Sequence, residues 1–193
     1  MISKLCHKRT FISNAASAVI DFIYMVESKL IHKSRNFDFI NITEKLPNGN
    51  TASIDMIKHP GAAVIVPFLT KDKVVIIWQY RQAIQKYIFE FPAGTLEKGE
   101  DPKLCAYREL IEETGYKASK MTFLGDVIPV PGYSSEVLKI YSAHGLKPVG
   151  AKTEDSEVIE TKVFSRSQVR SMFRSGKIVD GKTIAALAMI KWI

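Results

Sequence analysis

Two runs rich in valine and isoleucine, residues 62–69 and 73–79, constrain the fold of this chain more than any other feature. Continuous apolar runs of this length are typical of strands buried on both faces, and Val and Ile favour strands over helices. Both runs fall far short of the ~20 apolar residues that a membrane-spanning helix needs. We therefore predict a sheet covered on both sides, in a protein without a membrane partner.

The rest of the pattern predicts an α+β sandwich in which strands dominate. Segments 37–42 and 52–57 alternate between polar and apolar side chains around Pro47-Asn48-Gly49-Asn50, a turn sequence typical of a hairpin. Apolar residues spaced three or four apart favour a helix over residues 14–30. Further strands are expected at 123–130, 137–143 and 157–164, a turn at Pro131-Gly132, and two closing helices at 167–174 and 182–192.

The composition favours a globular protein with an anionic ligand. The 193 residues include 27 basic and 20 acidic side chains, and the net charge of +7 suits nucleotides, nucleic acid or an acidic membrane surface. The first 20 residues hold no acid. This segment is interpreted as an upstream extension or a helical arm, with an organelle-targeting peptide as the alternative and Met25 as an alternative start.

The cysteines indicate a reducing compartment, and we expect a cytoplasmic protein. Cys6 and Cys105 are too few to form a disulfide framework. Neither has a His or Cys neighbour at metal-ligand spacing, so no structural zinc site is predicted. Cys105 falls within a helical segment, where it is interpreted as a small apolar packing residue.

That helical segment has clear ends. Asp101 is a good N-cap, Pro102 suits the first helical position, and Gly115 suits the left-handed residue that follows a helix. The residues predicted to form its single apolar stripe are Leu104, Tyr107, Leu110 and Ile111.

The same helix carries three carboxylates, Glu109, Glu112 and Glu113, and Glu100 lies just before it. Glu109 and Glu113 are four residues apart, so they project to the same side, about 6 Å from each other. Folding does not require this repulsive pair, whereas a hard cation such as Mg²⁺ binds clustered carboxylates together with substrate phosphates. A solvated acidic helix face is the alternative explanation.

The spacing of residues 94–115 favours the metal site. It reads glycine, five residues, glutamate, seven residues, Arg-Glu, an apolar residue, any residue, Glu-Glu, any residue and glycine. A chance match to the seven fixed positions is on the order of 10⁻⁷. The chain thus resembles the Nudix hydrolases, which carry this signature, and the resemblance implies a Nudix-type α/β/α sandwich with a mixed β-sheet, plus a small N-terminal β-rich region.

The resemblance also implies a divalent metal site, with Mg²⁺ as the expected cofactor and Mn²⁺ as a substitute. The residues assigned to this site are the carbonyl of Ala93 and the carboxylates of Glu100, Glu109 and Glu113. Glu112, a ligand or a close support of the metal, and Arg108 are counted among the catalytic residues. Arg108 is expected to brace Glu112 as an i,i+4 pair, and Glu100 and Arg108 mainly organise the site. Metal ions held there would neutralise charge on a pyrophosphate and activate the attacking water.

A closer resemblance, over about residues 31–193, is to the ADP-ribose pyrophosphatase branch of this family. It depends on WQYRQ at 78–82, EFPAGTLEKGE at 90–100 and PVPGYSSE at 129–136. The resemblance implies hydrolysis of ADP-ribose, a nucleotide-sugar substrate, to AMP and ribose 5-phosphate by a homodimer. No nucleic-acid partner is expected.

This branch supplies further site assignments. Arg81 would contact the substrate phosphates through its forked donors. Pro131 is the proline characteristic of the branch, and Glu136 would bind the terminal ribose hydroxyls or assist the metal site. Trp78 stands where the family often has an arginine, so a phosphate or dimer contact is missing or replaced there, or Trp78 simply packs in a core or an interface.

The family also takes a catalytic carboxylate from a late loop. Glu157 is the residue chosen, with Glu154 and Asp155 as alternatives, and its expected role is to complete the metal shell or to accept a proton from water. In relatives, N-terminal strands swap between subunits and supply aromatic side chains that stack on adenine. Phe37 and Phe39 are candidates, although aromatic side chains at strand spacing are more often core residues.

The predicted organisation is an N-terminal extension at residues 1–30, an N-terminal hairpin region at 31–58 and a Nudix hydrolase domain at 59–193. Two other functions compete with ADP-ribose hydrolysis. The first is a pyrophosphatase for another nucleotide sugar, such as GDP-mannose. The second is a non-catalytic nucleotide sensor or nucleic-acid binder, which is supported by charge alone.

Overall fold

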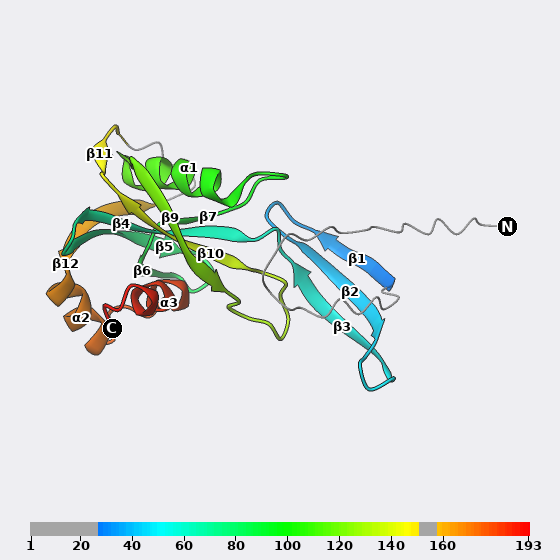
Figure 1. Cartoon of the computed structure of the whole chain (residues 1–193). Helices are drawn as coiled ribbons and strands as arrows, with labels where there is room; N and C mark the ends of the chain where they lie inside the picture. The colour runs from blue at the N-terminus through cyan, green and yellow to red at the C-terminus, as the bar shows by residue number, and fades with distance from the viewer. Residues whose placement is uncertain (1–26, 151–157) are drawn as a thin grey trace.

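The computed structural model describes residues 27–150 and 158–193. Figure 1 shows a layered body with a small sheet projecting from one end. The strands are β1 (Glu27–Lys33), β2 (Asp38–Lys45), β3 (Thr51–Lys58), β4 (Ala62–Thr70), β5 (Lys73–Arg81), β6 (Lys86–Glu90), β7 (Ala93–Thr95), β8 (Tyr116–Lys117), β9 (Lys120–Val127), β10 (Leu138–His144), β11 (Lys147–Pro148) and β12 (Ile159–Ser165). The helices are α1 (Pro102–Thr114), α2 (Arg166–Arg174) and α3 (Gly181–Met189).

The central sheet is mixed. Its seven strands follow the order β12-β5-β4-β10-β9, with β6 paired to β5 and β7 paired to β4. Strand β10 runs parallel to β4, whereas the other pairs in this sheet are antiparallel. The two apolar runs form β4 and β5 as predicted, and residues Val74 to Ile77 of β5 are fully buried.

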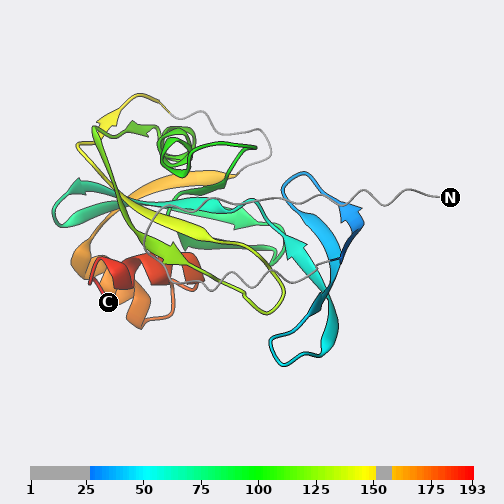
Figure 2. The ribbon, with the colours of Figure 1, turned by 45° about the vertical axis from the view of Figure 1, so that its right-hand side comes forward.

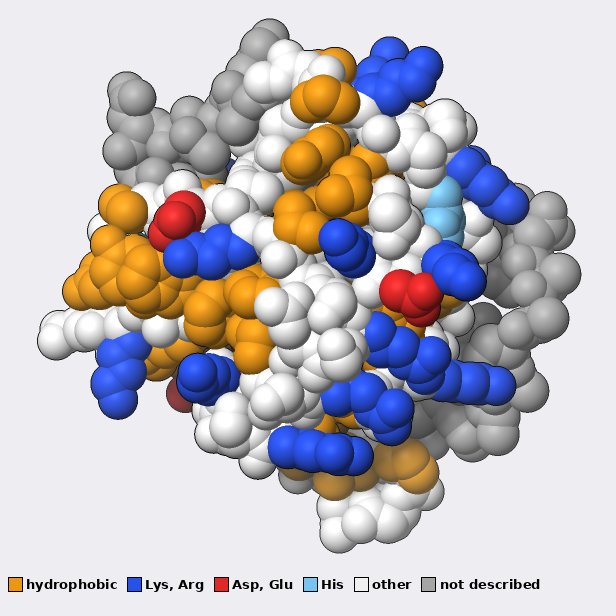
Figure 3. Space-filling view, turned by 90° about the vertical axis from the view of Figure 1, so that its left-hand side faces the viewer, with side chains coloured by type: hydrophobic (Ala, Val, Ile, Leu, Met, Phe, Trp, Pro, Cys, Tyr) orange, Lys and Arg blue, Asp and Glu red, His pale blue; other side chains and the backbone are white. Residues whose placement is uncertain are grey.

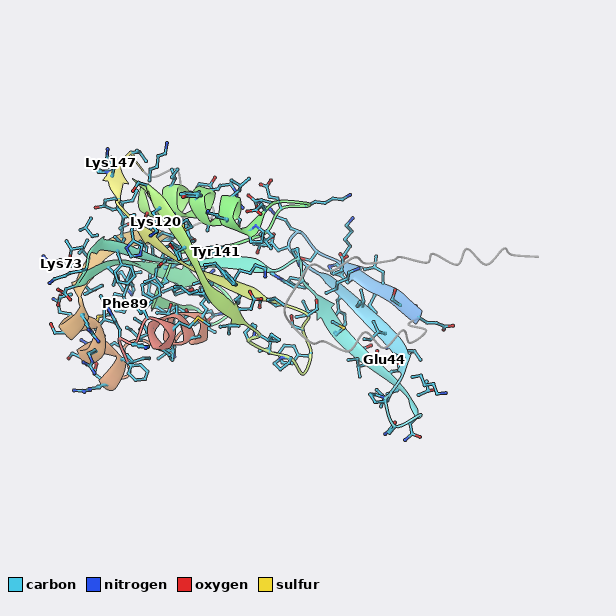
Figure 4. The ribbon with its side chains drawn as sticks, in the orientation of Figure 1. Glu44, Lys73, Phe89, Lys120, Tyr141 and Lys147 are labelled. Carbon is cyan, nitrogen blue, oxygen red and sulfur yellow. The ribbon has the colours of Figure 1, made fainter. Side chains whose placement is uncertain are left out.

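Helices cover both faces of this sheet, because alternate side chains of a strand point to opposite sides. Ala63 and Ile65 of β4 join a core with α1, while Val64 and Val66 join a core with α2 and α3. Figure 4 labels one aromatic residue from each side: Tyr141 belongs to the α1 core, and Phe89 packs against the other. The predicted α+β sandwich with a mixed sheet is confirmed.

The N-terminal sheet has the order β1-β2-β3 and extends away from the main body (Figure 2). The predicted hairpin is present: the N–H of Leu46 donates to the carbonyl of Asn50 at 2.7 Å, and Gly49 adopts a φ of +86°. The helix predicted over 14–30 is wrong at its described end, since residues 27–30 belong to β1. Residues 14–26 lie outside the part of the chain that the structure describes.

Several other boundaries differ from the predicted ones. Strand β9 begins and ends three residues before the predicted strand at 123–130, and α3 ends at Met189 rather than at 192. Strands β6, β7, β8 and β11 were not predicted, because they are short and lack a distinct pattern.

No helix in the described ranges has the length and apolar character needed to cross a membrane. Figure 3 shows the end of the molecule turned away from the N-terminal sheet, where Lys and Arg side chains lie among apolar patches. Helix α2 contributes the exposed Arg170 and Arg174 to the basic side chains of the surface.

Candidate active site

Helix α1 is fixed at both ends by the residues predicted to cap it. The side chain of Asp101 accepts hydrogen bonds from the N–H groups of Lys103 at 2.9 Å and Leu104 at 3.3 Å. Pro102 is the first helical residue, and Gly115 ends the helix with a φ of 71°. The helix therefore presents its carboxylates in a fixed register relative to the preceding loop.

The face that α1 buries matches the predicted apolar stripe only in part, since Leu110 is fully buried and Tyr107 packs against the same core. Leu104 of that stripe is 62% exposed. The buried residues of the helix are Cys105, Ala106, Glu109, Leu110, Glu113 and Thr114. Apolar pattern alone failed here because two carboxylates, Glu109 and Glu113, occupy the inner face beside β7. Burying charged groups costs free energy unless they are paired, and Arg108 and the N–H of Ala93 supply partners for these two acids on the inner face.

Strand β7 lies so close to α1 that a side chain at position 94 would displace the carboxylate of Glu109. A Cβ atom built on Gly94 would overlap the carboxylate of Glu109. On the neighbouring turn of the helix, the Oε2 atom of Glu113 accepts a hydrogen bond from the N–H of Ala93 at 2.9 Å. Two of the three carboxylates that the sequence assigned to a metal site, Glu109 and Glu113, therefore lie against the backbone at residues 93–94.

Arg108 organises the surrounding acids. Its Nε and Nη2 atoms each donate to one oxygen of Glu100 at 2.9 Å, and its Nη1 atom donates to Glu109 at 2.6 Å and to Glu112 at 3.1 Å. Hydrogen bonding to Glu100 raises the pKa of Arg108, and the same bonds lower the pKa of Glu100. Glu100 also accepts from the N–H of Glu97 at 3.0 Å, so both of its oxygens are engaged by Arg108 and the loop.

A second cation, Arg81, approaches the site from the end of β5. Its Nε and Nη2 atoms both donate to the carboxylate of Glu90 at 2.7 Å. Burial alone would raise the pKa of Glu90, which is fully buried, but the bonds from Arg81 and the charge of Lys182 outweigh burial and lower that pKa. Arg81 thus stays charged, with part of its guanidinium exposed (39% of the side chain).

Apart from Glu90, Glu100 and Lys182, these groups line one cavity of about 880 Å³. Its walls come from residues 33–38, 58–60 and 93–98, from Arg81, and from the four α1 residues Arg108, Glu109, Glu112 and Glu113. In Figure 1 the loop before α1 extends toward the connection between β1 and β2, and both segments line this cavity. The cavity therefore joins the carboxylate face of α1 to basic residues of the N-terminal sheet, among them Lys33 and Lys58.

The donors on α1 suit a hard divalent cation, because Glu109, Glu112 and Glu113 offer only oxygen. Within residues 27–150 and 158–193, no three His, Cys, Asp or Glu side chains are gathered closely enough to hold an ion by themselves. Mg²⁺ does not require such a cage, since it usually binds one or two carboxylates and keeps waters and substrate phosphates in its other positions. The residues therefore fit a metal ion that is shared with an anionic substrate.

Two predicted substrate residues, Pro131 and Glu136, do not line the cavity. Pro131 is exposed in the turn after β9. Glu136 lies 3.8 Å from the Nδ1 atom of His59, which does line the cavity. The turn is held against β3, since the N–H of Ile57 donates to the carbonyl of Tyr133 at 2.8 Å.

The three late-loop acids, Glu154, Asp155 and Glu157, lie outside the residues that the structure describes. The described chain resumes at Val158, whose carbonyl accepts a bond from the N–H of Tyr80 at 3.1 Å, one residue before Arg81.

The aromatic candidates separate clearly. Phe37 lines the cavity and is 38% exposed, whereas Phe39 is absent from its lining. Trp78 packs against Tyr87 and Phe89, with ring centroids 4.5 and 6.2 Å away, and it does not line the cavity. The packing explanation of Trp78 fits these contacts.

Sequence reasoning missed Glu90, Asp180 and Lys182, and it missed the basic cavity residues Lys33, Arg35, Lys58 and Lys98. A signal for Glu90 was present: it is a lone carboxylate in the run Ile88-Phe89-Glu90-Phe91, where only a paired acid is tolerated. Lys182 carried no signal, because its partner is 92 residues away in the sequence.

Cys105 provides a test of how tightly α1 packs against this site. Burial raises the pKa of its thiol to about 12, and the Sγ atom lies 3.5 Å from the carbonyl of Gly94. At pH 8 only about one thiol in 10⁴ is then ionised. In a Cys6→Ser protein we expect Cys105 to resist a disulfide reagent until the chain is unfolded with guanidinium. Rapid labelling of the native protein at pH 8 would contradict this packing.

Comparison with known proteins agrees with the geometry. The model of the NUDIX domain matches residues 58–187. The chain is 32% identical over 173 residues to the ADP-ribose pyrophosphatase of Bacillus subtilis (strain 168), covering 86% of this chain and 94% of that protein. It is 36% identical over 149 residues to the methanol dehydrogenase activator of Bacillus methanolicus, covering 76% and 80%.

Two further proteins bear on specificity and fold. The GDP-mannose pyrophosphatase of Salmonella typhimurium is 30% identical over 183 residues, covering 86% of this chain and 93% of that protein. A crystal structure of an ADP compounds hydrolase superposes with a TM-score of 0.73 at 22% identity, covering 87% of this chain and 92% of the other. This likeness shows that the fold is shared.

Proposed function

Because the chain belongs to the NUDIX domain family and is a Nudix hydrolase, we propose that it hydrolyses the diphosphate linkage of ADP-ribose, with Mg²⁺ as its cofactor. The products are AMP and ribose 5-phosphate. The observation that carries this function is the single cavity in which the buried acids of α1 and the guanidinium of Arg81 lie on the same lining. A diphosphate needs both a site for its metal ion and a cation for its phosphates.

The hydrogen-bond partners of the acids on α1 support a separate role for each acid. Glu109 and Glu113, together with the carbonyl of Ala93, would hold the metal ion, and Glu112 would act as a further ligand or a close support. When bound, a divalent ion neutralises charge on the diphosphate and makes a coordinated water more acidic. Arg108 keeps Glu109 and Glu112 in place, and Glu100 fixes Arg108 through two hydrogen bonds. We therefore propose Glu100 as a residue that organises the metal site rather than as a direct ligand.

The other walls of the cavity would bind the substrate. Of the five N–H groups of an arginine, two of Arg81 bond to Glu90, which leaves three for phosphate oxygens. A volume of about 880 Å³ suits a nucleotide sugar, because small-molecule pockets span roughly 300–1,000 Å³. Phe37 would stack on the base, and its position on the cavity lining supports this role.

The remaining assignments rest on the sequence resemblance. Glu136 would bind the terminal ribose hydroxyls or assist the metal site, near His59 at the cavity edge. Pro131 would shape the turn that carries Glu136. Glu157 would accept a proton from the attacking water or complete the metal shell, with Glu154 and Asp155 as the alternatives.

We further propose that the protein is a cytoplasmic homodimer. Its proposed organisation is an N-terminal extension at residues 1–30, an N-terminal hairpin region at 31–58 and a Nudix hydrolase domain at 59–193. The N-terminal sheet supports this organisation, since it projects from the main body and exposes Leu30, Ile31 and Ile54 at 54%, 48% and 46%.

A substrate panel tests the proposed function. The full chain is incubated with Mg²⁺ and, in separate assays, ADP-ribose, GDP-mannose and other nucleotide sugars, and kcat/KM is measured for each. We expect ADP-ribose to give the highest kcat/KM. The panel is informative because pocket contacts determine which substrate is preferred. A higher value for GDP-mannose would support the alternative suggested by the Salmonella relative. No turnover of any diphosphate would overturn the proposed function.

A further inference from the structure

A buried carboxylate, Glu90, lies between two cations next to the proposed active site. Its oxygens accept both hydrogen bonds from Arg81 at 2.7 Å, and the ammonium group of Lys182 donates to Oε2. The Glu90 side chain is fully buried and that of Lys182 is 16% exposed. Arg81 is the member of this group that reaches the cavity.

Lys182 is itself held by Asp180, the N-cap residue of α3. The Nζ atom of Lys182 lies 3.0 Å from Oδ1 of Asp180, and Oδ2 of Asp180 caps the helix by accepting from the N–H of Thr183 at 2.9 Å. The hydroxyl of Thr183 accepts from the N–H of Phe91 at 2.8 Å. The start of α3 is thus bonded to two consecutive residues, Glu90 and Phe91, just before the strand that carries Ala93.

We propose that Lys182 is a positioning residue for Arg81, acting through Glu90 to aim the guanidinium at the substrate diphosphate. This inference rests on the proposed function, in which Arg81 binds phosphate. Neither Lys182 nor Asp180 lines the cavity, so neither would touch the substrate itself.

Two physical effects support this role. Lys182 bonds the same oxygen of Glu90, Oε2, that accepts from the Nη2 atom of Arg81. It therefore fixes the carboxylate so that both hydrogen bonds to Arg81 keep one geometry and the other three N–H groups keep one direction. Lys182 also shares the negative charge of Glu90. Arg81 is therefore only partly neutralised by its partner, and more of its positive charge acts on an anion in the cavity.

The test compares Lys182→Met with Lys182→Arg and with the control Lys177→Met, an exposed lysine remote from the cavity. The Kd for ADP is measured by calorimetry in Mg²⁺ buffer, and KM and kcat are measured for ADP-ribose. We expect Lys182→Met to raise Kd and KM about tenfold while kcat changes less, the pattern of lost substrate binding. Lys182→Arg should recover most of the affinity, and the control should match the wild type.

Repeating Lys182→Met in an Arg81→Met protein separates positioning from a general structural role. If Lys182 acts through Arg81, it has no further effect on the Kd for ADP once Arg81 is removed, because the two changes are coupled. An equal loss in both backgrounds would overturn the inference. If Lys182→Met unfolds below the assay temperature, Lys182→Gln, which keeps a donor but no charge, replaces it and should also weaken binding.

The two readouts distinguish failure of this inference from failure of the proposed function. A wild type that cleaves ADP-ribose, with Lys182→Met unchanged in Kd and KM, overturns the inference alone. A wild type that binds ADP but cleaves no nucleotide sugar overturns the proposed function, and a weaker Kd in Lys182→Met would still support the inference. A wild type that does not bind ADP overturns the inference, because Arg81 then has no diphosphate to bind.

Discussion

Glu113→Gln is expected to lower kcat by about 10²–10³-fold, the scale seen when one preorganised group that stabilises transition-state charge is removed. The substitution removes one negative charge from the proposed metal site. It keeps a side-chain oxygen that can still accept the bond from the N–H of Ala93, now 2.9 Å from Glu113. The helix should therefore stay folded, and steady-state kinetics over a range of Mg²⁺ concentrations measures the loss.

The matched control is Glu160→Gln, which changes an exposed glutamate on β12 that pairs with Lys162 at 3.0 Å. Its kcat should equal that of the wild type. Thermal unfolding of Glu113→Gln should occur close to the wild-type temperature, since the amide oxygen can still accept the bond from Ala93. A Glu113→Gln protein with near-normal kcat would remove Glu113 from the metal site.

Gly94→Ala is expected to reduce kcat/KM about 100-fold, the cost of misplacing a catalytic group by roughly 1 Å. The new methyl group would overlap the carboxylate of Glu109. That carboxylate is the end of a flexible side chain and can move aside, so we expect the melting temperature to change little. Kinetics and thermal unfolding of the same preparation distinguish displacement of Glu109 from loss of the fold.

A double variant tests this explanation directly. In a Glu109→Ala protein the overlapping atoms are absent, so Gly94→Ala should cause no further loss of kcat/KM. The control is Gly132→Ala, since a Cβ there would meet no atom within 4 Å. An independent 100-fold loss in the Glu109→Ala background would contradict a steric origin.

The parts of the fold that could be predicted are those specified by neighbouring residues. Asp101, Pro102 and Gly115 fix the ends of α1 through local backbone chemistry. The turn around Gly49 needs a positive φ, which glycine adopts freely. Local signals of this kind do not depend on what the segment packs against.

The parts that could not be predicted depend on tertiary contacts. The predicted inner face of α1 was wrong at Leu104, because pattern reasoning buries Leu104 before Glu109, whereas the proximity of β7 and the charge of Arg108 reverse that order. Residues 27–30 were assigned to a helix because apolar spacing cannot reveal that β2 pairs with them.

In the candidate site too, the residues that local spacing specifies could be predicted, and those that depend on tertiary contacts could not. The spacing along α1 identified its acids, because all of them lie within one helix and the loop before it. The support of Arg81 by Glu90 and Lys182 was invisible, because it joins β5, β6 and the start of α3. Such a contact follows from the topology of the sheet and not from any local pattern.

A ³¹P NMR time course of ADP-ribose with the full-length protein tests the central claim most directly, because it follows the diphosphate bond itself. In Mg²⁺ the diphosphate signals should be replaced by those of AMP and ribose 5-phosphate in equal amounts, and excess EDTA should stop the conversion. Diphosphate signals that persist in Mg²⁺, or hydrolysis that continues undiminished in EDTA, would contradict metal-dependent hydrolysis at the carboxylates of α1.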